Sequence, residues 1–76
     1  MRYRAVIKQV DDWWIGWLID LPGVNAQERT RAEVIDSLRL GAQEMLEAPV
    51  AFEIDATMVA IDVPEPGWVL EPVAAP

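Results

Sequence analysis

With 76 residues, the chain is long enough for one domain and close to the size at which a single hydrophobic core only just suffices. It has no cysteine and no histidine, which excludes disulfides, thiolate or imidazole metal sites and a histidine general base. The net charge is −7, and the imbalance lies in residues 40–76, which carry seven acids and no cation, whereas residues 1–39 carry six of each. This acidic half disfavours nucleic-acid binding and either suits a basic partner or serves solubility alone.

The composition also limits the cellular setting. Hydrophobic residues make up 53% of the chain, which indicates a packed domain and not a disordered one. No apolar run reaches the roughly 18 to 20 residues that a membrane span needs. The first residues lack the pattern of a signal peptide. We therefore expect a soluble, cytoplasmic protein that does not bind membranes.

The first predicted elements are two strands joined by a tight turn. Residues 2–10 alternate in a half-buried strand pattern, Asp11-Asp12 is typical of a turn, and residues 13–20 are rich in aromatic and β-branched residues. Cross-strand partners share a face of the sheet. A hairpin closed symmetrically about the turn has three predicted pairs: Gln9 with Trp14, Ile7 with Gly16, and Ala5 with Leu18.

This register sends the three tryptophans of the second strand to opposite faces. One helix covers only one face, which leaves an apolar patch larger than a soluble monomer usually exposes. We expect this patch to be a self-association surface formed by Trp13, Ile15, Trp17 and Ile19. The alternative is cover within the chain, from Arg4 and Lys8 lying across the rings or from an arm carrying Trp68.

A short third strand and one amphipathic helix follow. Residues 24–26 form the predicted strand. Thr30 and Glu33 match a capping box, so the helix should run from Arg31 to Ala48, where the following proline ends it. Gly41 interrupts the apolar stripe of this helix, which predicts a close approach to the sheet, over Gly16.

The end of the chain predicts one more strand and an arm. Residues 52–63 alternate again, and residues 64–76 contain four prolines, typical of an extended arm. The predicted order is β-β-β-α-β, an α+β fold with an antiparallel sheet and one helix packed on one face. We expect a domain over residues 1–63 and an arm over residues 64–76.

Few side chains are suited to catalysis. Ser37 lies mid-helix with no histidine to activate it, and no glycine-rich phosphate loop is present. We therefore expect no enzyme activity, no cofactor and no metal site. A DNA-binding repressor would need a basic surface that the six scattered cations do not form.

Four features together resemble the HicB-like antitoxin family. They are Tyr3 in an apolar strand, an aromatic second strand, the "DLPG" of Asp20–Gly23, and Thr30 with Glu33 opening a helix. The resemblance covers residues 2–48. The chain departs from the family pattern at Ile19, Glu28-Arg29 and Val34, and it has no C-terminal DNA-binding domain of the kind that many members carry.

The resemblance implies an antitoxin that neutralises a small basic HicA-like mRNA-cleaving toxin by covering its RNA-binding surface. Acidic side chains would take the place of RNA phosphates and apolar side chains would anchor the contact. The candidate partner-binding residues are Glu44, Glu47, Glu53, Asp55 and Trp68. The alternative is a stand-alone homo-oligomer, a structural or small-ligand-binding domain with no toxin partner.

Overall fold

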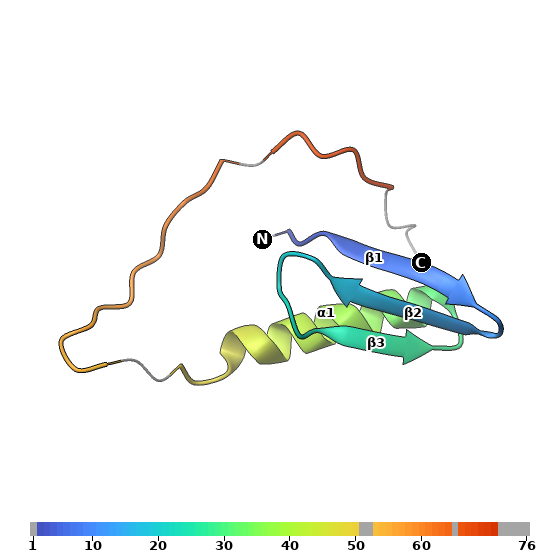
Figure 1. The fold of residues 1–76 in the computed structure, drawn as a ribbon, viewed down its shortest axis with the longest axis horizontal. Helices are drawn as coiled ribbons and strands as arrows, with labels where there is room; N and C mark the ends of the chain where they lie inside the picture. The colour runs from blue at the N-terminus through green and yellow to red at the C-terminus, as the bar shows by residue number, and fades with distance from the viewer. Residues whose placement is uncertain (1, 51–52, 65, 72–76) are drawn as a thin grey trace.

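A computed structural model describes residues 2–50, 53–64 and 66–71 (Figure 1). Its three strands form one antiparallel sheet in the order β1-β2-β3, and a single helix packs on one face. This confirms the predicted α+β class. The elements are β1 (Ala5–Val10), β2 (Trp13–Leu18), β3 (Asn25–Glu28) and α1 (Arg31–Glu47).

The β1–β2 hairpin has the register predicted from its turn. The structure pairs Gln9 with Trp14 and Ile7 with Gly16, and the ladder closes with Val10 opposite Trp13. The two-residue turn places Asp11 at φ 55°, a left-handed conformation that aspartate tolerates better than most residues. The turn therefore fixes which face each side chain of β2 occupies.

Gly16 identifies the face that α1 covers. A Cβ atom at this position would lie 2.9 Å from Ile7 Cγ2 and 2.9 Å from Leu38 Cδ1, so the α-carbon of Gly16 faces the helix. Even-numbered residues of β2 therefore point toward α1, and odd-numbered residues point away. The buried apolar residues between the layers are Leu18, Val24, Val34, Leu38 and Ala42.

Gly41 approaches a different residue from the one predicted. Its nearest neighbour is Val24, since a Cβ at Gly41 would lie 3.0 Å from Val24 Cγ1, whereas Leu38 is the helix residue above Gly16. The reason is that the chain before β3 crosses the helix at this point: Val24 is buried, and its carbonyl accepts a hydrogen bond from Leu18 N at 3.1 Å. The third strand accordingly begins one residue later than predicted and runs to Glu28.

The helix begins at the predicted residue, Arg31, and ends at Glu47, one residue earlier than predicted. Thr30 is the N-cap, and its hydroxyl accepts from Glu33 N at 3.1 Å and donates to the Glu33 carboxylate at 2.8 Å. The Glu33 side chain thus contacts the Thr30 hydroxyl, whereas in a full capping box it would accept from the backbone N–H of the N-cap residue. Ala48 is the C-cap, directly before Pro49. Among the described residues, no helix has both the length and the apolar character needed to cross a membrane.

The strand predicted over residues 52–63 is not confirmed. The described part, residues 53–63, contains no strand; a turn interrupts it, with Ala56 N donating to Glu53 O and Asp55 at φ 69°. Every described residue from 53 to 64 is exposed, because this segment extends away from the sheet (Figure 1). The predicted boundary after residue 63 rested on that strand and stays a prediction.

Gly16→Ala tests the contact between the two layers. The new Cβ would lie within 3.1 Å of the Val6 carbonyl oxygen as well as the two side chains, so we expect the free energy of unfolding to fall by about 1 to 3 kcal/mol. Urea denaturation followed by tryptophan fluorescence measures it. The matched control is Gly67→Ala, whose Cβ would meet nothing within 4 Å and should change stability by less than about 0.5 kcal/mol. Equal effects of the two substitutions would contradict the close approach.

Candidate functional site

The first candidate site is the face of the sheet that α1 does not cover, here called the open face. Strand alternation places Trp13, Ile15 and Trp17 on it, with Ile19 following in register because Ile19 N donates to Arg4 O at 2.9 Å. Cross-strand pairing adds the neighbouring side chains of the edge strands, which are Val6, Lys8, Val10, Asn25 and Gln27. The structure therefore brings together all four residues predicted for self-association, in an apolar stripe with a polar border.

The open face is only partly covered by the chain itself. Trp13 and Trp17 are each 37% exposed and Ile19 is 45% exposed. The guanidinium of Arg29 lies 3.7 Å from the centre of the Trp13 ring, a cation–π contact. The alternative prediction was cover by Arg4 and Lys8; at Trp13 this place is taken by Arg29, because β3 ends beside the start of β2 (Figure 1). The apolar stripe thus remains accessible to another protein.

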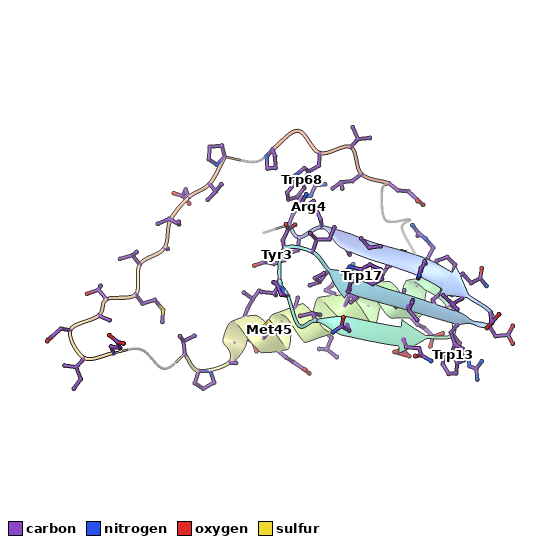
Figure 2. All side chains as sticks on the ribbon, in the orientation of Figure 1. Tyr3, Arg4, Trp13, Trp17, Met45 and Trp68 are labelled. Atoms are coloured by element: carbon purple, nitrogen blue, oxygen red, sulfur yellow. The ribbon has the colours of Figure 1, made fainter. Side chains whose placement is uncertain are left out.

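Arg4 is held instead by Asp20, the first residue of the "DLPG" segment. Its Nη2 atom donates to Oδ1 at 2.7 Å and its Nε to Oδ2 at 3.0 Å, a bidentate ion pair. The backbone N–H of Arg4 also donates to Asp20 Oδ2, at 2.7 Å. On its other side, the guanidinium lies 4.6 Å from the centre of the Trp68 ring (Figure 2). Arg4 therefore joins the hairpin, the turn after β2 and the C-terminal arm.

The ion pair shifts both ionisation equilibria. The side-chain hydrogen bonds from Arg4 lower the pKa of Asp20, and the backbone N–H of Arg4 lowers it further. The same contact raises the pKa of Arg4 above its usual value. Extending the predicted hairpin register by one pair places Arg4 opposite Ile19 and so beside Asp20, which is the sequence signal from which this ion pair could have been predicted.

The acidic residues predicted to bind a partner do not lie on the open face. Glu44 and Glu47 occupy the exposed last turn of α1, in the other layer of the domain, and Glu53 and Asp55 lie in the exposed segment beyond it. Trp68 packs against Arg4, which leaves it half-buried. The structure therefore separates two surfaces: an apolar one on the sheet and an acidic one at the end of the helix and in the arm.

The described residues offer little for catalysis or metal binding. Among them, no three or more aspartate or glutamate side chains gather into a group that could hold an ion. The Ser37 hydroxyl donates to the Glu28 carboxylate at 2.6 Å, which ties α1 to β3.

Comparison with known proteins adds no relative. The chain matches no protein-family model, no curated protein and no solved structure.

Asp20→Asn tests the joint between β1 and the turn after β2. Because the pKa of Asp20 is lowered in the folded protein, its ionised form stabilises the fold; this contribution is complete above about pH 4 and is lost as the pH falls through the folded-state value. We expect Asp20→Asn to be less stable than the parent at pH 7 and to lose less stability between pH 4 and pH 2. Urea midpoints across this range measure the effect. The control Asp12→Asn removes the same charge from the exposed turn and should keep the parent's pH profile.

Proposed function

We propose that this chain is a protein-binding module of the antitoxin type. The observation that carries the proposal is the open face, where two tryptophans and two isoleucines form an accessible stripe on a sheet with no second covering layer among the described residues. Aromatic residues of this kind supply most of the energy at protein interfaces. The open face is proposed as the surface through which two copies associate, by an isologous contact.

The last turn of α1 supports a basic partner. A helix C-terminus carries a partial negative charge that favours cations, yet this one holds Glu44 and Glu47 and no basic residue. The two glutamates therefore oppose the stability of the isolated helix. A cationic partner bound there would offset the repulsion, which is a reason to retain acids at this position.

The class of partner follows from the resemblance to HicB-like antitoxins. It is a small basic ribonuclease whose RNA-binding surface would be occluded by the acids at the end of α1 and by Glu53 and Asp55 in the exposed segment that follows. These acids are expected to speed association and make it sensitive to salt. The open face would anchor the assembly of two copies, which presents two acidic surfaces to two toxin molecules.

A stand-alone homo-oligomer is the second candidate, because the open face supports it without any toxin. The two candidates share the contact between copies and differ in whether the acidic surface has a protein partner. They are therefore separable by experiment.

Trp17→Glu tests association through the open face. It places a charge in the apolar stripe, so we expect the parent to have at least twice its chain mass of 8.5 kDa at micromolar concentration and the variant to have a lower mass than the parent. Light scattering after size-exclusion chromatography measures both masses. Leu40→Glu adds the same charge to an exposed side chain of α1 and serves as the control. A parent of 8.5 kDa at high micromolar concentration would exclude the open face as a stable contact between copies.

Co-expression with an adjacent small basic reading frame tests the partner. We expect the neighbour to arrest growth alone, and the pair to restore growth and co-purify. Changing Glu44 and Glu47 together to lysine should raise the melting temperature of the isolated protein while slowing its association with the toxin about tenfold or more at low salt. The control replaces Asp12 and Asp62, two exposed acids, with lysine, which is an equal change of charge. A neighbour that neither harms cells nor binds would leave the homo-oligomer as the better description.

A further inference from the structure

A groove runs between the outer edge of β1 and helix α1. It has a volume of about 1000 Å³ and exists because α1 packs mainly beneath β2 and β3, so the space under β1 is less filled. Apolar side chains of both layers, including Ile7, Ile35 and Leu46, form its floor. Its rim is basic, with four of the six cations of the chain: Arg2, Arg4, Arg31 and Arg39.

The end of the described arm is seated on this groove. The guanidinium of Arg4 lies 4.6 Å from the centre of the Trp68 ring (Figure 2). Glu71 accepts a hydrogen bond from Arg31 Nη2 at 2.8 Å. Between these contacts Val69 is 100% exposed and Leu70 is 40% exposed and lines the groove. Trp68, Leu70 and Glu71 thus contact the groove and its border, whereas Val69 points into solvent.

Cations and acids are divided unevenly between residues 1–48 and residues 49–76, although both parts carry a net negative charge. Residues 1–48 carry six cations and eight acids, a net −2, whereas residues 49–76 carry five acids and no cation, a net −5; the two sum to the chain's −7. The arginines concentrate on the groove that the arm contacts. The groove therefore selects an extended segment with an aromatic residue, an aliphatic residue and an acid, which is the chemistry of Trp68, Leu70 and Glu71.

Residues 53–64, which lead to this segment, leave large apolar side chains in water when the arm docks on its own domain. Residues 53–64 extend away from the sheet, and five large aliphatic side chains remain mostly in water (Figure 1). Their exposed fractions run from 64% to 93%, for Ile54, Met58, Val59, Ile61 and Val63. If the arm crosses to a second domain, every contact of the groove is kept. The exposed side chains of residues 53–64 then gain a surface against which they can pack.

We propose that the groove between β1 and α1 takes the arm of a second copy of this chain, in a reciprocal exchange between two domains. Each domain donates residues 66–71 and receives the same segment. Exchange of an identical element makes a dimer without any new type of contact, and the long span after Pro49 permits the crossing. The arm contact lies along the outer edge of β1: Arg4, whose backbone pairs with Ile19, stands where this edge meets the open face, whereas Arg31 lies on α1, in the other layer.

Cross-linking between two tagged chains tests the exchange directly, because the chain has no cysteine of its own. One full-length chain carries Ala32→Cys, beside Arg31 on α1, and the other carries Val69→Cys, at a side chain that points away from the groove. With a flexible bis-maleimide we expect a covalent pair containing both tags. The control pairs Asp12→Cys with Val69→Cys and should give none, because the β1–β2 turn lies at the far end of β1 from Arg4. Linkage only when both new cysteines occupy one chain would overturn the proposal in favour of docking within the chain.

Charge reversal gives an independent measurement. In a sample of the Arg31→Glu variant alone, two acidic side chains face each other at the arm contact, and in a sample of Glu71→Arg alone, two arginines do. We therefore expect each substitution alone to weaken the arm contact at least fivefold. Mixed in equal amounts, the two variants restore both attractive pairs only across two chains, and the cross-link yield should return to the parent's level. No recovery on mixing would contradict exchange.

The Trp17→Glu chain separates this inference from the proposed function. Its open face is disrupted while the groove and arm are unchanged, so the cross-link between Ala32→Cys and Val69→Cys should persist in that background. Loss of the cross-link there would overturn the exchange and assign the pairing of copies to the open face.

Discussion

One constraint organises the domain: a single helix covers one face of a three-stranded sheet, and the alternation of a strand places adjacent tryptophans on opposite faces. Trp13 and Trp14 therefore cannot share a core. Gly16 decides between the faces, because its missing side chain leaves the space that Leu38 fills. Because α1 covers that face, Trp13 and Trp17 lie on the opposite one. The apolar open face is therefore a consequence of the packing at Gly16.

The ion pair of Arg4 and Asp20 is the second interaction on which the structure depends. The planar guanidinium uses its edge for the carboxylate and its face for Trp68, two recognition modes that a lysine would not combine in the same way. Asp20 thereby fixes the plane of Arg4 and orients the face on which the arm rests. The "DLPG" segment thus has a structural role as the support of a contact made far later in the chain.

The elements that depend on local interactions could be predicted from the sequence. Symmetric closure about Asp11-Asp12 predicted every pair of the hairpin that we named, and the capping pair Thr30 and Glu33 with Pro49 predicted both ends of the helix to within one residue. Period-two alternation in residues 52–63 failed as evidence for a strand, because alternation describes two faces and does not supply a neighbouring strand to pair with. The contacts of Arg29 with Trp13 and of Arg31 with Glu71 join residues 16 and 40 positions apart, and they depend on where β3 and the arm lie in space.

The arginine-lined groove also has a consequence for any basic partner. Glu71, which pairs with Arg31 at the groove, is an acid that a cationic protein would also attract. A partner that uses Glu71 must first displace Arg31, and its apparent dissociation constant is raised in proportion to the fraction of arms already docked. Salt weakens both competing contacts together. The groove therefore competes with cationic proteins for the arm, and only a protein that binds the arm more tightly than the groove does is retained.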